Sequence, residues 1–264
     1  MQLIYVFLAT LITIVGAAET KDNYFAFLEM IQQPNGNFRQ GEIEVVVDPA
    51  EIAKIEEIQK KRLIQKGFSD EEAVQSSKIG IVSEDIYWIW IRDAVYFPKG
   101  VPGTYDRLMW KTEGRGAAVL PVLANGRVVL NLNFRHATRS WELELPRGIG
   151  KKGETLEQTA LRELKEETGL EADSAVFLGE MVPDSGTICS IVPIYLGRVS
   201  KQGLSDREYS EAIADILSFS KEELKKGLLD GYLEVPLNGN KQKVPLRDSF
   251  TAFAILQAEL RKLL

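Results

Sequence analysis

The feature that most constrains this chain is a glycine-containing loop that runs directly into a helix rich in carboxylates. Gly148, Gly150 and Gly153 interrupt the loop, residues 155–168 carry apolar side chains three and four positions apart, and Gly169 follows. Apolar residues at that spacing form one face of an α-helix, and glycine commonly follows a helix end. The segment therefore predicts a tight loop and an amphipathic helix that ends at residue 168.

Three glutamates share one face of this predicted helix. Glu163, Glu166 and Glu167 stand at i, i+3 and i+4, so their carboxylates are neighbours. Like charges at this spacing repel one another, and within the helix only Arg162 and Lys165 relieve them. A bound divalent cation accounts for such a cluster, whereas a solvated, charge-rich helix face is the alternative explanation.

Composition narrows the choice of metal and partner. The 264 residues hold 32 Lys and Arg against 38 Asp and Glu, a net charge of −6, which disfavours nucleic acid as a partner. His136 is the only histidine and Cys189 the only cysteine, so a multi-cysteine zinc site and an internal disulfide are excluded. Oxygen ligands remain, and they favour Mg²⁺, with Mn²⁺ as a substitute.

The loop and helix resemble the signature of the Nudix hydrolase superfamily, in which a glycine, a glutamate and an Arg-Glu-apolar-x-Glu-Glu-x-Gly-apolar segment recur at fixed spacing. All nine specified positions are matched within 23 residues, which makes the resemblance far more specific than a lone glycine motif. The matching residues are Gly148, Glu154, Arg162, Glu163, Leu164, Glu166, Glu167, Gly169 and Leu170.

The resemblance implies an α+β fold, an α/β/α sandwich with a mixed β-sheet, that hydrolyses a nucleoside diphosphate linked to another moiety. It makes Glu163 and Glu167 the main Mg²⁺ ligands, while the carbonyl of Arg147 completes the site. Glu166 is expected to hold a further ion or its water, which makes it a catalytic residue as well. Bound metal would neutralise the diphosphate oxygens and lower the pKa of the attacking water.

The flanking sequence is similar to the ADP-ribose pyrophosphatase branch over residues 85–260. In that branch an arginine after an aromatic residue faces the substrate, which nominates Arg135, because a guanidinium pairs bidentately with phosphate. Glu144, just before a Leu-Pro turn, either contacts the ribose or ends a strand. Pro183 departs from the position of proline in many relatives, so nucleotide sugars and NADH stay open as substrates beside ADP-ribose.

The general base is expected in a late loop, where the family often carries a glutamate. Glu208 and Glu211 fit that position, and Glu211 is favoured because Glu-Ala-Ile resembles the entry to the following strand. Hydrolysis of ADP-ribose would release AMP and ribose 5-phosphate. A non-catalytic nucleotide-binding module is the alternative from another class, and it is disfavoured because such a module need not keep every metal-ligand position.

The first 18 residues form a segment of their own. Residues 3–15 are apolar and uncharged, and Gly16, Ala17 and Ala18 precede the polar run that starts at Glu19, which outlines a signal peptide. The apolar run is shorter than the roughly 20 residues that span a bilayer, which favours cleavage over a membrane anchor through residues 3–18. A soluble apolar segment is the third possibility. Cleavage would make the protein periplasmic or secreted; otherwise it is membrane-anchored or cytoplasmic.

The rest divides into a helical N-terminal extension, residues 19–84, and a main domain, residues 85–264. Asp48 and Pro49 predict the start of a helix over 49–66, and Ser69 predicts the cap of a second one. Relatives commonly dimerise through the N-terminal part, so a homodimer is expected. Strands are predicted in the main domain, followed by terminal helices. The predicted strands cover 86–91, 94–97, 117–123, 127–134, 175–180, 188–199 and 212–219.

Overall fold

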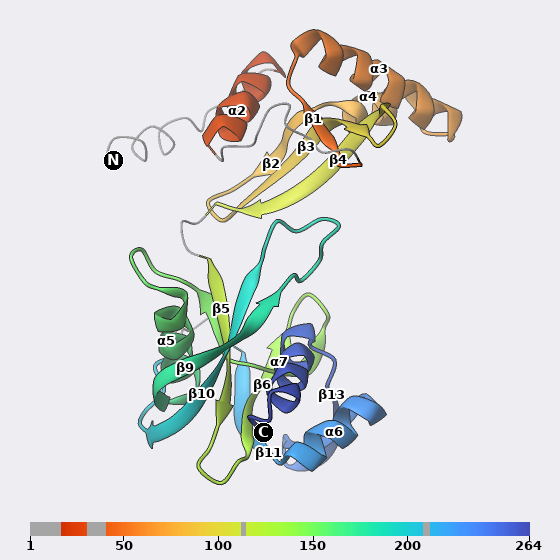
Figure 1. Cartoon of the computed structure of the whole chain (residues 1–264). Helices are drawn as coiled ribbons and strands as arrows, with labels where there is room; N and C mark the ends of the chain where they lie inside the picture. Colours follow the sequence, from red (N-terminus) through yellow and green to blue (C-terminus); the bar gives the residue numbers. More distant parts are fainter. Residues whose placement is uncertain (1–16, 31–40, 112–114, 208–211) are drawn as a thin grey trace. The chain divides into compact units, whose positions relative to one another are not determined.

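The computed structural model describes residues 17–30, 41–111, 115–207 and 212–264, which group into two compact units (Figure 1). The first unit holds the residues up to Lys111 together with Gly186–Cys189, and the second holds the remainder. Most of the predicted signal segment, and both predicted bases, lie outside the described residues. Within the described ranges, no helix is long and apolar enough to cross a membrane.

The first unit combines three helices with a four-stranded sheet. Asp48 caps α3 by accepting the Glu51 N–H at 2.9 Å, and Ser69 caps α4 in the same way, so both predicted helices are confirmed. Strand β3 pairs along its whole length with β4, and with β1 and β2 on its other side. The elements are α2 (Ala17–Met30), β1 (Glu44–Val46), α3 (Pro49–Gln65), α4 (Asp70–Ser77), β2 (Gly80–Glu84), β3 (Trp88–Phe97) and β4 (Val101–Trp110).

One expectation for this region changes. Residues 85–111 group with the first unit, so the N-terminal part is not a purely helical extension, because β3 and β4 complete its sheet. Strand β3 is buried on both faces from Ile91 to Val95, and one face is open nearer its start. Its Ile89 and Ile91 are buried against α2 and α3, but Trp90 on the opposite face is 39% exposed.

The second unit is built on a seven-stranded mixed sheet. Its strand order is β11-β6-β5-β10-β9, with β7 added beside β6 and β8 beside β5; β5 and β10 run parallel and the other pairs are antiparallel. The elements are β5 (Gly116–Val122), β6 (Val128–Arg135), β7 (Ser140–Glu144), β8 (Arg147–Ile149), α5 (Leu156–Thr168), β9 (Leu170–Met181), β10 (Val192–Gln202), β11 (Ile213–Phe219), α6 (Lys221–Asp230), β12 (Tyr232–Leu237), β13 (Asn240–Pro245) and α7 (Ser249–Leu260).

Helices cover both faces of this sheet, which confirms the expected α/β/α sandwich (Figure 1). Ala160 and Leu164 of α5 pack on Val119 and Val129, whereas Ala254 and Ile255 of α7 belong to the larger core on the opposite face. Each strand therefore sends alternate side chains to different helices, as strand geometry requires.

The predicted strands miss β1, β2, β4, β7 and β8, and differ in further details. Strand β10 begins at Val192 rather than residue 188, because Thr187 and Cys189 hydrogen-bond to Leu108 of β4 instead. A hairpin, β12–β13, stands between the terminal helices and buries Val235, Leu237 and Val244 in the core. Strand β9 begins directly after Gly169.

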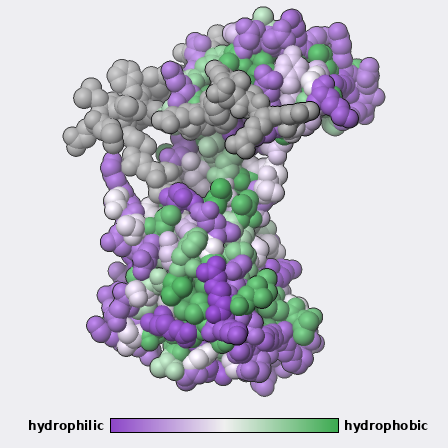
Figure 2. Space-filling model, in the orientation of Figure 1, coloured by the Kyte–Doolittle hydropathy of each residue, from purple (hydrophilic) through white to green (hydrophobic). Residues whose placement is uncertain are grey.

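Apolar side chains gather on the face of the second unit that Figure 2 shows. Among the described residues, Val176 and Phe177 on the edge strand β9 are both close to half exposed. The homodimer stays a prediction.

Candidate active site

The loop and helix that the sequence singled out form as expected. A capping box starts α5: the Thr155 side chain accepts the Gln158 N–H at 3.2 Å, and the Gln158 side chain accepts the Thr155 N–H at 2.8 Å. Gly169 ends the helix at φ +74°, a left-handed conformation that glycine adopts without a steric penalty. The helix is therefore fixed at both ends by its own sequence.

The predicted carboxylates lie together on α5. Glu163 and Glu167 are each only 7% exposed, and the side chain of Glu166 is about a quarter exposed (28%). Gly148 lies directly against Glu163, because a Cβ at that position would overlap the Glu163 carboxylate. The first glycine of the loop thus makes room for a buried carboxylate.

Arg162 lies at the centre of the carboxylates. Its Nε donates to Glu154 at 2.8 Å, and its Nη1 donates to Glu163 at 2.7 Å and to Glu166 at 2.6 Å. Its Nη2 donates to the carbonyl of Ile149 at 2.8 Å. One guanidinium therefore ties the loop to the helix and neutralises much of their negative charge.

These contacts keep the carboxylates ionised. Hydrogen bonds from Arg162 hold the pKa of Glu154 at about 2. Partial burial opposes ionisation of Glu166, but hydrogen bonds from Lys151 and Arg162 outweigh it and lower its pKa. Lys151 reaches Glu166 at 3.0 Å from the loop, whereas Lys165, expected to relieve the cluster, pairs with Glu171 at 3.2 Å.

The low pKa of Glu154 makes stability depend on pH. Its ordinary pKa is 4.5, so the pairing with Arg162 stabilises the fold above pH 4.5 and is lost as the pH falls toward 2. At pH 7 we expect Glu154→Gln to unfold with about 1 kcal/mol less free energy than wild type in urea titrations. The difference in unfolding free energy between the variant and wild type should narrow below pH 4.5. An equal difference at pH 7 and pH 3 would contradict the low pKa of Glu154.

One face of β6 turns polar where α5 ends. Val129 packs against α5, and on the same face Asn131, Asn133 and Arg135 follow at every second position. On β7, Glu144 pairs in register with Asn131. This polar alternation is visible in the sequence and could have identified Asn131 and Asn133, which were missed.

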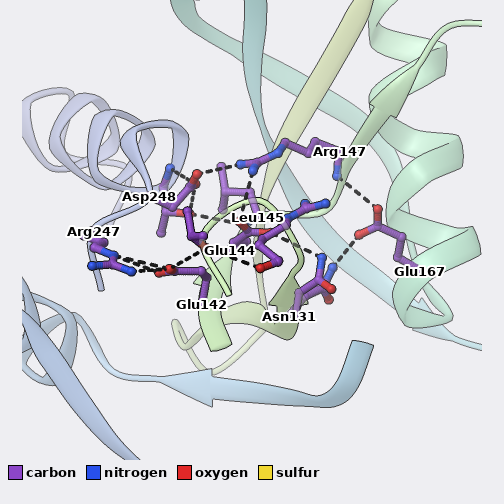
Figure 3. A network of polar contacts seen from close by, with 12 residues as sticks. Asn131, Glu142, Glu144, Leu145, Arg147, Glu167, Arg247 and Asp248 are labelled. Carbon is purple, nitrogen blue, oxygen red and sulfur yellow. Dashed lines mark hydrogen bonds and ion pairs between the residues drawn. The ribbon is translucent and has the colours of Figure 1, made fainter. Parts of the chain in front are cut away.

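Glu144 lies between two arginines in the polar network of Figure 3. The side chain is almost fully buried; Oε2 accepts from Arg135 Nε at 2.7 Å and Oε1 accepts from Arg147 Nη2 at 3.1 Å. The two predicted substrate-binding residues, Arg135 and Glu144, are therefore direct partners. Arg135 remains 41% exposed at its side chain, so its guanidinium is both oriented and accessible.

Arg147 links the carboxylate helix to α7. Its backbone N–H points at Glu167 Oε1 at 3.4 Å, and its guanidinium donates to Asp248 at 2.8 Å and lies 4.4 Å from the centre of the Phe250 ring. Asp248 also caps α7 by accepting the Thr251 N–H at 2.9 Å. The sequence around Asp248 indicates only a helix cap. Its contact with Arg147 is not visible there, because Arg147 lies about 100 positions earlier in the chain.

The segment that precedes residues 208–211 is tied to the end of α5. The Asp206 N–H donates to the carbonyl of Glu166 at 2.8 Å, and Arg207 donates to the carbonyls of Glu167 at 2.7 Å and Ile213 at 3.2 Å. Glu208 and Glu211 themselves lie outside the described residues and stay predictions.

The residues around the cluster suit a hard divalent cation. Within the described ranges no three His, Cys, Asp or Glu side chains form a finished metal cage, since Arg162 and Lys151 occupy carboxylate oxygens of Glu163 and Glu166. The donors are nevertheless all oxygen, and the amide oxygen of Asn131 is buried without a hydrogen-bond partner among described residues. Carboxylate and amide oxygens are the ligands that Mg²⁺ and Mn²⁺ prefer, so a cation fits if it competes with the two basic side chains.

Comparisons with known proteins agree with this geometry. Residues 112–231 match the family model of the NUDIX domain. The ADP-ribose pyrophosphatase of Bacillus subtilis (strain 168) is 31% identical over 207 residues, which cover 77% of this chain and 97% of that protein. The ADP-sugar pyrophosphatase of Mus musculus is 32% identical over 133 residues, 45% of this chain and 58% of that protein.

The fold is also found in a solved structure. The crystal structure of an ADP compounds hydrolase superimposes with a TM-score of 0.56, covering 70% of this chain and 91% of the other at 18% identity. This likeness confirms the expected fold.

Proposed function

Because the chain belongs to the Nudix hydrolase family, we propose that it hydrolyses the diphosphate bond of ADP-ribose to release AMP and ribose 5-phosphate. As a family member it is a pyrophosphohydrolase, and its relatives support ADP-ribose or ADP-sugar type substrates. The observation that carries the proposal is the complete signature folded as one unit, with Glu163 and Glu167 buried beside Gly148.

The residues of α5 are assigned to the diphosphate chemistry. Glu163, Glu167 and the carbonyl of Arg147 would hold Mg²⁺, and Glu166 a further ion or its water. A divalent cation, when bound, neutralises diphosphate oxygens and lowers the pKa of water. Arg162 keeps the helix and the loop in register, which its contacts with Glu154 and Ile149 support.

A loop glutamate is assigned as the general base. Glu211, with Glu208 as the alternative, would accept the proton of the attacking water. The proposal is supported by the hydrogen bonds of Asp206 and Arg207 to the last turn of α5, since they bring the chain next to the carboxylates. A base must come within hydrogen-bond distance of its proton donor, and Asp206 and Arg207 directly precede Glu208 in the sequence.

Arg135 and Glu144 are assigned to substrate binding. Glu144 accepts from Nε of Arg135 at 2.7 Å and forms an ion pair with Nη2 at 2.6 Å, and it thereby orients the guanidinium. A fixed guanidinium can pair with a phosphate in two parallel hydrogen bonds.

Arg135→Lys is expected to raise the KM for ADP-ribose about tenfold while kcat changes less, because an ammonium is a point charge without the planar fork. Steady-state kinetics measure both constants. Arg139→Lys is the matched control, since Arg139 is exposed and contacts His136 rather than Glu144. Equal KM values for wild type and Arg135→Lys would remove Arg135 from the binding site.

A substrate panel tests the proposal. The complete chain is assayed with Mg²⁺ against ADP-ribose, ADP-glucose and NADH, and kcat/KM is compared. We expect ADP-ribose to give the highest value. A higher kcat/KM for a nucleotide sugar or NADH would reassign the substrate. No hydrolysis with either Mg²⁺ or Mn²⁺, while the compounds still bind, would favour the non-catalytic module.

A further inference from the structure

We propose that Asn131 is a positioning residue for the carboxylate cluster: its amide nitrogen fixes Glu167, and its amide oxygen is a further oxygen acceptor for the hydrated cation. The inference rests on the proposed metal-dependent function. It assigns a role to a residue of β6 that lies outside the signature on α5.

Asn131 is a polar side chain buried among mostly apolar neighbours. It is 2% exposed on β6, a strand whose other buried positions are mostly apolar, such as Leu130 and Leu132. Its Nδ2 donates to Glu167 Oε2, and Figure 3 shows the two side chains meeting between β6 and α5. Burying an amide costs free energy unless its nitrogen and its oxygen both have hydrogen-bond partners. The surroundings of the amide oxygen therefore need an explanation.

The amide oxygen is the second polar atom of the side chain. With Nδ2 directed at a carboxylate, Oδ1 is the remaining polar atom; the reverse orientation would set two oxygens against each other. Oδ1 is buried and has no hydrogen-bond partner among the described residues. An acceptor left over beside an ionised carboxylate suits a cation or the water that a cation carries.

The other hydrogen bond to Glu167 completes the arrangement. The Arg147 backbone N–H lies 3.4 Å from Glu167 Oε1, so each carboxylate oxygen has its own donor. Two donors from different strands set the rotation of the carboxylate. Partners of this kind orient metal ligands, and their loss typically lowers metal affinity about tenfold to a hundredfold.

The test measures Mn²⁺ binding by the complete chain, by titration calorimetry or by electron paramagnetic resonance of free Mn²⁺. Asn131→Leu, which keeps the size but removes both polar atoms, is expected to bind about tenfold to a hundredfold more weakly than wild type. Asn133→Leu is the matched control. It makes the same change on the same strand face, but Asn133 donates to Glu144 at 3.3 Å, so metal affinity should stay at the wild-type value.

A second variant serves if Asn131→Leu does not fold. In Asn131→Asp a carboxylate faces Glu167, so the metal-free protein should melt at a lower temperature than wild type, and Mn²⁺ should raise its Tm by more than that of wild type. An equal rise in Tm, or wild-type Mn²⁺ affinity in Asn131→Leu, would overturn the role of Asn131. Failure of wild type itself to bind Mn²⁺ would instead refute the metal-dependent function.

Discussion

Glu167→Gln is expected to lower kcat for ADP-ribose hydrolysis by about a hundredfold to a thousandfold, the range seen when one preorganised electrostatic group is removed. Glutamine keeps the shape of the side chain but loses the charge that a cation requires. It also turns an amide nitrogen toward Asn131 or the Arg147 N–H, which are both donors. Initial rates at saturating Mg²⁺ and ADP-ribose measure the effect.

Glu171→Gln is the matched control for this substitution. Glu171 lies four positions after Glu167, just past the helix end, and pairs with Lys165 at 3.2 Å on a partly exposed surface. Its kcat should stay at the wild-type value. Wild-type kcat in Glu167→Gln, with normal melting of both variants, would refute the assigned metal site.

Arg162→Ala is expected to have the largest effect on stability. The Arg162 side chain is 17% exposed and its bonds reach Glu154, Glu163 and Glu166, so its removal leaves three neighbouring carboxylates without their shared counter-charge. Breaking a buried ion pair on one side typically costs about 3–5 kcal/mol, and partial exposure places this loss near about 3 kcal/mol. Urea unfolding at pH 7 in the presence of a chelator measures it.

A divalent cation should restore part of that stability. Mg²⁺ or Mn²⁺ can neutralise the same carboxylates that Arg162 leaves behind, so the metal should raise the free energy of unfolding more in Arg162→Ala than in wild type. Arg139→Ala, which changes an exposed arginine, should show neither the loss nor the recovery. Equal metal effects in Arg162→Ala and wild type would mean that the carboxylates do not bind the cation together.

Local sequence was enough to predict the parts of the site that one segment builds. The helical period places Glu163, Glu166 and Glu167 on one face whatever the tertiary fold, and Thr155 and Gly169 mark the helix ends. The glycine loop is local too, although only the structure shows that Gly148 is needed because Glu163 lies against it.

Contacts between distant segments could not be predicted in this way. Arg147 meets Asp248 across about 100 positions, and nothing in either local sequence specifies the other. Strand β4 was missed because Pro102 and Gly103 resemble a turn, while the partners that make it a strand belong to β3. The alternation of Asn131, Asn133 and Arg135 is visible in the sequence, but the contact of Asn131 with Glu167 is made only when the sheet packs against α5.

The most direct test of the central claim is the product analysis of ADP-ribose hydrolysis by the complete chain, with Mg²⁺ and again after chelation with EDTA. We expect AMP and ribose 5-phosphate with Mg²⁺, and neither product after chelation or in Glu167→Gln. Unchanged product formation in EDTA, or no AMP with Mg²⁺ or Mn²⁺ while ADP-ribose still binds, would contradict a metal-dependent ADP-ribose hydrolase.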